Sequence, residues 1–122
     1  MQLVPDLDGR TALVTGSAQR VGRELLLTLA AAGADVAVHY NTSADAAETT
    51  AADAREYGVD VTTVSGDITD PQAVDELFDT IESHLGSVDI LVNNVGNFDA
   101  RHWADIEWDA WRDTVESTFY GT

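Results

Sequence analysis

Cysteine and lysine are both absent from the 122-residue sequence. Without cysteine, the chain can form no disulfide and has no thiolate nucleophile. Without lysine, its 6 basic residues are all arginines, and they stand against 22 acidic residues, which gives a formal net charge of −16. Nucleic acids and anionic membranes bind clustered positive charge, so the composition excludes both as partners.

Long apolar runs are missing as well. The N-terminus lacks a basic region followed by an apolar stretch, and no segment approaches the length of a membrane span. We therefore expect a cytoplasmic protein. Its acidic residues are spread along the whole chain, which predicts a solvated surface whose self-repulsion needs screening by counterions. This charge pattern favours the high-salt cytoplasm of a halophilic organism.

Short β-type runs alternate with segments of helical periodicity along the chain. The hydrophobic content of 44% and the presence of only 2 prolines predict one packed domain over residues 1–122. Runs rich in β-branched residues predict strands at 11–15, 35–40, 60–65 and 89–94. Apolar residues three or four positions apart predict the inward faces of two of the helices: Val21, Leu25 and Leu29 in the first, and Val74, Leu77, Phe78, Ile81 and Leu85 in the third.

The junctions between these segments agree with the alternation. Gly33, Gly58 and Gly86 each follow a helical segment, where glycine supplies a left-handed cap. Asp70 followed by Pro71 is typical of a helix start. Three β-α units in succession predict an α/β fold with right-handed crossovers: a doubly wound parallel sheet of about four strands, with helices on both faces.

The expected strand order, 3-2-1-4, would leave the fourth predicted strand as an apolar edge. Such an edge needs covering. We therefore expect a homo-oligomer that associates through this strand and a helix over 108–120, whose Trp108, Trp111 and Val115 share one face, or else a missing remainder of the protein.

The stretch "TGSAQRVG", residues 15–22, stands between the first strand and the first helix. A glycine-bearing turn at this place sets backbone N–H groups and a helix N-terminus against an anion, usually a pyrophosphate. The spacing is not that of the G-x-G-x-x-G motif, and by itself it is compatible with a plain tight turn.

Three stretches in order, "TGSAQRVG", "GDITD" and "VNNVG", resemble the motifs of the short-chain dehydrogenase/reductase family. The resemblance implies a single dinucleotide-binding (Rossmann) domain without the catalytic C-terminal half, a nicotinamide cofactor, and hydride transfer to or from a small carbonyl or alcohol substrate. It implies a pyrophosphate turn around Gly16 and Gly22, an adenine site at Asp67, and a ribose and nicotinamide site at the end of the fourth strand. The cofactor-binding residues that it implies are Gly16, Ser17, Arg20, Val21, Gly22, His39, Tyr40, Asn41, Ser43, Asp67, Ile68, Asn93, Asn94, Val95 and Gly96.

Arg20 departs from the commonest family pattern, which has glycine there. The loop looks like that of the pteridine-reductase-like branch, in which an arginine stands beside the phosphates, and His39 and Ser43 resemble that branch's phosphate-contacting residues. Thr42 stands where an arginine is expected. The second strand ends in "VHYNTS", with no acid to hold ribose hydroxyls or repel a 2′-phosphate. The sequence therefore favours NADP(H) over NAD(H).

Catalytic residues are the missing part of the resemblance. The family's tyrosine acts with a lysine four residues later, and this chain has no lysine. The family's helix asparagine aligns with Thr118. We therefore assign no catalytic residue and no metal ligand, and we expect the chain alone to be inactive. Two alternatives stay open: a non-catalytic module that binds a nucleotide or a protein, and, less favoured, a methyltransferase-like Rossmann domain.

Overall fold

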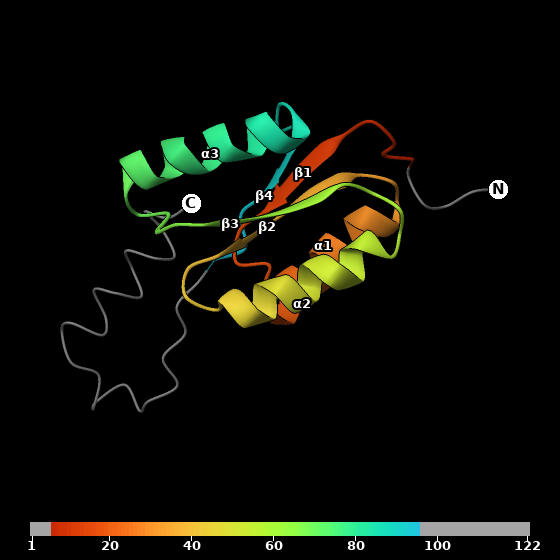
Figure 1. Ribbon diagram of the computed structural model, residues 1–122, viewed down its shortest axis with the longest axis horizontal. Helices are drawn as coiled ribbons and strands as arrows, with labels where there is room; N and C mark the ends of the chain where they lie inside the picture. The colour runs from red at the N-terminus through yellow and green to blue at the C-terminus, as the bar shows by residue number, and fades with distance from the viewer. Residues whose placement is uncertain (1–5, 96–122) are drawn as a thin grey trace.

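The computed structural model describes residues 6–95. Strands and helices alternate strictly within this part of the chain (Figure 1). In order they are β1 (Thr11–Val14), α1 (Arg20–Ala31), β2 (Asp35–Tyr40), α2 (Ala44–Arg55), β3 (Val61–Ser65), α3 (Pro71–Leu85) and β4 (Ile90–Val92).

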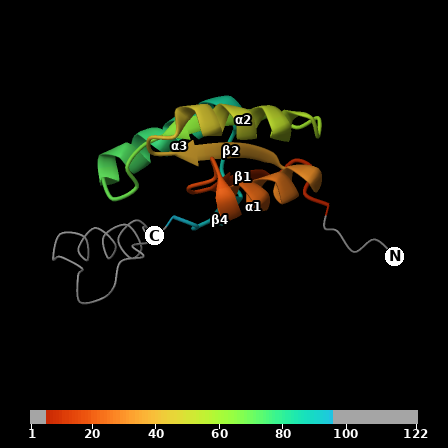
Figure 2. The ribbon, with the colours of Figure 1, turned by 90° about the horizontal axis from the view of Figure 1, so that it is seen from below.

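The four strands form one parallel sheet in the order β3-β2-β1-β4, which confirms the predicted topology. Ala12 of β1 pairs with Val36 of β2 on one side and with Ile90 of β4 on the other. Helices α1 and α2 cover one face of the sheet and α3 covers the other (Figure 1). Seen from below, α1 and α2 run alongside each other (Figure 2). Helices therefore cover both faces of the sheet, as in a doubly wound fold.

The strands begin where aspartates tie their first residues together. Asp35 Oδ1 accepts the N–H of Asp60 at 2.9 Å, and Asp89 Oδ2 accepts the N–H of Thr11 at 2.9 Å. These carboxylates follow the glycines that end α1 and α3. The strand predicted over 89–94 pairs only from Ile90 to Val92. The second strand has the predicted bounds.

The buried face of α1 differs from the prediction by one residue. Gly22, Leu26 and Ala30 are buried against the sheet, whereas Val21 is 65% exposed and Leu25 39% exposed. Gly22 faces inward because it approaches the loop after β1, as described below, and Leu26 and Ala30 follow it on the same side of the helix. Leu29 is partly buried and packs against the core. The prediction that Val21 and Leu25 face the core is therefore wrong.

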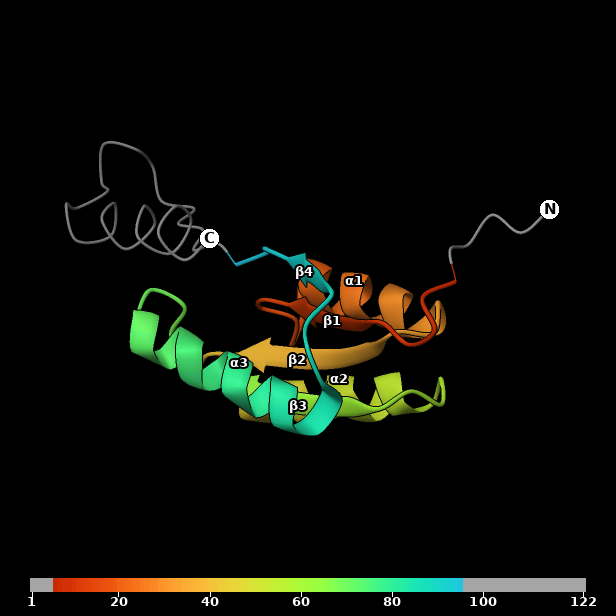
Figure 3. The same ribbon diagram turned by 90° about the horizontal axis from the view of Figure 1, so that it is seen from above.

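Helix α3 follows its predicted pattern. Leu77 and Ile81 are buried, and Phe78 and Leu85 pack against the same cluster. The three glycines that end the helices all have positive φ, as predicted. Seen from above, α3 lies over the β3 side of the sheet, and β4 lies at the opposite edge (Figure 3). Leu91 of β4 is accordingly 48% exposed.

None of the helices between residues 6 and 95 is long and apolar enough to cross a membrane. Several sequence predictions lie outside the described residues. They are the helix with Trp108, Trp111 and Val115, the cofactor contact of Gly96, and the replacement of the family asparagine by Thr118.

Candidate functional site

The carboxyl ends of all four strands meet at one edge of the sheet, and the loops that leave them carry the residues that the motifs predicted. In open parallel sheets this edge is where ligands bind. Gly16 follows β1, His39 is the second-last residue of β2, Asp67 follows β3 and Asn94 follows β4. The structure therefore brings the predicted site residues that it describes to a single region.

The loop after β1 needs glycine at two places. Gly16 has φ +63°, a conformation that L side chains rarely adopt. A Cβ atom on Gly22 would lie 2.3 Å from the carbonyl oxygen of Gly16 and 2.6 Å from the side-chain amide nitrogen of Asn94. The first turn of α1 can therefore pack against the loop only because Gly22 has no side chain.

Arg20 has φ +59° and is exposed. Among the described residues it is the one non-glycine residue with positive φ. An L residue in this conformation costs about 1–2 kcal/mol relative to a right-handed one. The backbone thus keeps the geometry that favours the family's glycine, although an arginine occupies the position.

Helix α1 starts without a side-chain cap. Gln19 is extended, with φ −157° and ψ 171°, and its side chain makes no capping hydrogen bond. The first turn contains no acidic residue. Because the first N–H groups of a helix have no partner within it, Arg20, Val21 and Gly22 present theirs at the turn. An anion at this place would satisfy them and interact favourably with the helix dipole.

His39 and Ser17 are buried supports of this loop rather than exposed groups. His39 is 2% exposed: its Nδ1 accepts the N–H of Gly16 at 2.9 Å, and its Nε2 lies 2.9 Å from the carbonyl oxygen of Gly66. Ser17 is fully buried and its hydroxyl accepts the N–H of His39. The polar atoms of the His39 ring and of the Ser17 hydroxyl bond to backbone groups inside the protein, and contact of these two residues with a cofactor stays a prediction.

Asn94 joins the end of β4 to the same loop. Its side-chain amide nitrogen lies 3.3 Å from the carbonyl oxygen of Thr15 and 3.4 Å from that of Gly16. In return, Thr15 Oγ1 accepts the N–H groups of Asn94 and Val95. Asn94 thus bonds neighbouring loops, while Asn93 is exposed at the strand end.

The loop after β3 places Asp67 and Ile68 beside this edge. Asp67 Oδ1 accepts the Thr69 hydroxyl at 2.6 Å and the Thr69 N–H at 2.9 Å. These hydrogen bonds, the hydroxyl's first, lower the pKa of Asp67 from its ordinary value. The carboxylate is therefore both a turn residue and an exposed acceptor, since neither bond uses Oδ2.

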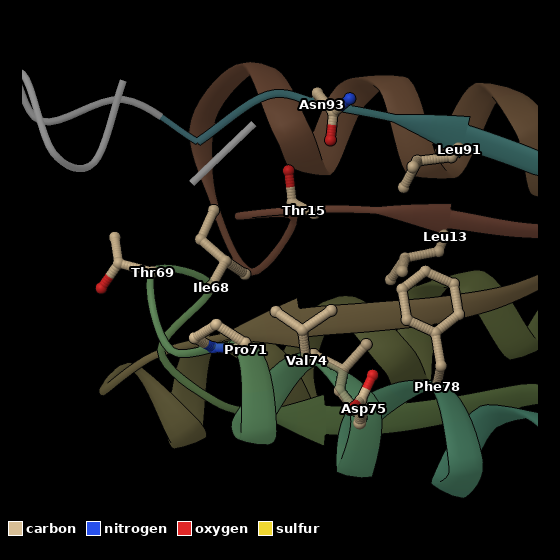
Figure 4. A pocket seen from close by; sticks show the side chains of 11 residues that line it. Leu13, Thr15, Ile68, Thr69, Pro71, Val74, Asp75, Phe78, Leu91 and Asn93 are labelled. Carbon is tan, nitrogen blue, oxygen red and sulfur yellow. The ribbon is translucent and has the colours of Figure 1, made fainter. Parts of the chain in front are cut away.

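A cavity of about 390 Å³ opens between α3 and the β1–β4 side of the sheet. Figure 4 shows Ile68 at one end of it, Asn93 and Thr15 above it, and Phe78 at the far side. Leu13 and Leu91 line it from the strands, on the same side as Thr15 and Asn93 and opposite α3. Two residues predicted from the motifs, Ile68 and Asn93, therefore line one hollow.

The loop after β2 meets the loop that carries Arg20. Gln19 Nε2 lies 3.5 Å from the hydroxyl of Ser43, the residue before α2. Asn41 is exposed and Tyr40 is half-buried at the strand end. The end of β2 therefore offers hydroxyl and amide groups, and no carboxylate, next to the start of α1.

Two polar residues outside the predicted set brace the site from α2. Thr50 is fully buried, donates to the carbonyl of Ala18 at 2.7 Å and accepts from Arg23 Nη1 at 3.0 Å. Arg23 also forms an ion pair with Asp53. One signal in the sequence could have identified Thr50: it is a threonine on a face of α2 that is otherwise lined by alanine.

Comparisons with known proteins agree with this architecture. The family model of short chain dehydrogenases matches residues 10–122. A short-chain type dehydrogenase/reductase of Picea abies is 37% identical, over 84% of this chain and 42% of its own length.

Two solved structures are also similar. A short-chain type dehydrogenase/reductase from Mycobacterium marinum superposes with a TM-score of 0.88 at 30% identity, over 95% of this chain and 47% of the other. A short chain dehydrogenase from Burkholderia cenocepacia in complex with NADP gives 0.87 at 35% identity, with the same coverage. The chain thus spans about half the length of these relatives. It belongs to the short-chain dehydrogenase family.

Proposed function

We propose that this chain binds NADP(H) and forms the cofactor-binding part of an oxidoreductase that transfers hydride to or from a carbonyl or alcohol. The observation that carries the proposal is the uncapped start of α1, packed against a glycine turn at the carboxyl edge of a parallel sheet. The dinucleotide fits this place, since Gly16 and Gly22 leave no side chain between the turn and the helix. When bound, its nicotinamide supplies the hydride donor or acceptor.

The chain's own residues would bind and orient the two halves of the cofactor. The N–H groups at the start of α1 would take the pyrophosphate, with Val21 beside it. Asp67, through Oδ2, and Ile68 would hold the adenine. Asn93 and Val95, at the end of β4, would border the ribose and nicotinamide half. A family member solved with NADP supports a nicotinamide dinucleotide as the ligand.

The preference for NADP(H) over NAD(H) rests on the end of β2. No carboxylate stands between Tyr40 and Ser43, and Arg20 lies on the loop that Gln19 joins to Ser43. We assign the 2′-phosphate to Arg20 and Ser43, which resemble phosphate-contacting residues of the pteridine-reductase-like branch, with Asn41 beside them, although Thr42 is not the arginine of that branch. Fluorescence titrations with NADPH and NADH test this. We expect tighter binding of NADPH, and a clear preference for NADH would overturn the assignment.

Catalysis is not expected from this chain alone, because it contains no lysine to lower the pKa of a catalytic tyrosine. The same absence favours the second candidate function, a non-catalytic module that binds the nucleotide. Both predict NADPH binding without turnover. Steady NADPH oxidation by the purified chain with small ketones or aldehydes would contradict both.

We also propose a high-salt cytoplasm as the setting of this protein. Every acidic residue in the part of the chain that the structure describes is exposed or half-buried. Thermal melts should show stability that rises from low to multimolar potassium chloride, because salt screens the repulsion among these charges.

Finally, we propose that the edge strand β4 is covered in the working protein, by a second copy or by further polypeptide such as its longer relatives have. The exposed apolar side chain of Leu91 on β4 supports this. Sedimentation in high salt should show self-association, and a well-behaved monomer would count against association through a second copy.

A further inference from the structure

Two loops at the carboxyl edge of the sheet converge on the ring of His39 in β2. Its two ring nitrogens reach backbone groups that are far apart in the sequence: the N–H of Gly16 after β1 and the carbonyl oxygen of Gly66 after β3, each at 2.9 Å. Its own N–H donates to the Ser17 hydroxyl, and its carbonyl accepts the N–H of Ser17. The residue therefore holds the glycine turn from behind.

The two ring contacts fix the protonation state of the ring. The Gly16 N–H can only donate, so Nδ1 must carry a lone pair. The Gly66 carbonyl can only accept, so Nε2 must carry the hydrogen. A neutral Nε2–H imidazole satisfies both groups, whereas an imidazolium would set a second hydrogen against the Gly16 N–H.

We propose that His39 is a positioning residue that presets the nucleotide-binding turn by clamping Gly16 to Gly66. That the clamp serves nucleotide binding rests on the proposed function. The hydrogen bonds of the clamp themselves are present in the chain without a nucleotide. With the Gly16 N–H directed inward to the ring, the N–H groups at the start of α1 are left to face the ligand. Preorganised donors bind an anion without the cost of ordering the loop.

Asparagine and glutamine separate the two halves of the clamp. The side-chain amide of asparagine reaches about as far from Cα as Nδ1 does, and that of glutamine reaches about as far as Nε2. H39N therefore keeps an acceptor for the Gly16 N–H, and H39Q keeps a donor for the Gly66 carbonyl. H84N serves as the control, because His84 is exposed on α3.

Amide exchange and imidazole ¹⁵N shifts test the clamp in the nucleotide-free chain. We expect the Nε2–H tautomer and slow exchange of the Gly16 amide in the wild type, slow exchange in H39N and fast exchange in H39Q. An Nδ1–H tautomer, or equal exchange in both variants, would overturn the clamp. This outcome does not depend on whether the chain binds a nucleotide.

Calorimetric titration with NADP⁺ tests the purpose of the clamp. H39Q should bind about tenfold more weakly than H39N, because a buried N–H is left without an acceptor. Equal affinities would refute the positioning role. If the wild type binds neither NADP⁺ nor NAD⁺, the proposed function fails, and amide exchange alone decides the clamp.

The dependence of NADP⁺ affinity on pH distinguishes a positioning role of the His39 ring from a purely structural role, which would leave this dependence unchanged. Burial lowers the pKa of His39, while the Gly66 carbonyl raises it less. The charged residues next to the two loops that contact the ring are Arg20, at the start of α1, and Asp67, directly after Gly66, but both ring nitrogens bond to backbone groups. NADP⁺ affinity should fall on acidification below pH 6.5 more steeply in the wild type than in H39N. The 2′-phosphate of NADP⁺ titrates in the same way with the wild type and with H39N, so it does not produce a difference between them. Identical dependence of affinity on pH in the two proteins would contradict the proposal.

Discussion

Helices α1 and α3 both start at the carboxyl edge of the sheet, but they complete their first turns differently. At α3, Asp70 accepts the N–H of Gln72 at 3.0 Å, and Pro71 occupies the first helical position. At α1, Gln19 makes no capping bond and the preceding Gly16 is left-handed. The α3 turn is closed by its own sequence, whereas the α1 turn presents N–H groups that a ligand can satisfy.

The uncapped, left-handed start of α1 is less stable than the capped start of α3, and contacts from other elements of the fold compensate for this. Helix α1 starts with an arginine at positive φ, and the loop before it is fixed by His39 from β2, by Asn94 after β4 and by Thr50 from α2. The loop before α3 is held mainly by local bonds of Asp67 and Asp70. Long-range support of a strained, uncapped turn is the pattern expected of a binding site.

The largest effect is expected from Gly22→Ala, which should push the first turn of α1 away from the loop after β1. The new methyl group would meet the Gly16 carbonyl oxygen at 2.3 Å, and neither backbone can yield cheaply. We expect a loss of about 3 kcal/mol in the free energy of unfolding, at the upper end for overpacking, and no measurable NADPH binding. Chemical denaturation and fluorescence titration measure the two effects.

Gly66→Ala is the matched control for this substitution. A methyl group there would have its nearest neighbours at 3.7 Å, which is ordinary contact. Its stability should stay close to that of the wild type. Equal losses in the two variants would show that the close approach of Gly22 is not what holds α1 in place.

Features that depend on neighbouring residues, such as the cap of α3, could be predicted from the sequence. Features that depend on contacts between distant residues, such as the packing of α1 on its loop, could not. The strand over 35–40 was found with its bounds because a buried parallel strand is apolar on both faces, and Asp70 with Pro71 was found because a cap is a local signal. The buried face of α1 was missed because it depends on Gly22 meeting Gly16 and Asn94 in space. The support by His39 was missed because its partners lie 23 and 27 residues away.

A cap introduced at α1 should remove the difference. Gln19→Asp would place a carboxylate where Asp70 stands in α3, since Gln19 already has the extended backbone of a capping residue. We expect about 1 kcal/mol of added stability from the cap and the helix dipole. NADPH affinity should fall by about tenfold or more, because the carboxylate repels the phosphates and competes for the N–H groups.

Gln19→Asn separates the charge from the cap, since asparagine caps about as well without repelling an anion. Its affinity should lie between those of the wild type and Gln19→Asp. Unchanged affinity in Gln19→Asp would mean that no phosphate binds at the start of α1.

A smaller effect is expected at Arg20. Its left-handed backbone lowers the stability of the fold, whereas its side chain is expected to strengthen NADPH binding. Arg20→Gly should raise stability by about 1 kcal/mol through relief of the left-handed strain, whereas Arg20→Ala should keep that strain. Both should weaken NADPH binding about tenfold and NADH binding little, if the guanidinium contacts the 2′-phosphate. Retained NADPH preference in both variants would assign Arg20 to the solvated surface.

The smallest effect is expected at α3, where Asp70→Ala removes the cap. Loss of the bond to the Gln72 N–H should lower the free energy of unfolding by about 1 kcal/mol, while Asp70→Asn should stay near the wild type because asparagine caps as well. NADPH affinity should remain nearly constant in both, since the α3 turn is closed by the protein itself. A large loss of affinity in Asp70→Ala, with stability unchanged, would mean that the start of α3 also belongs to the ligand site.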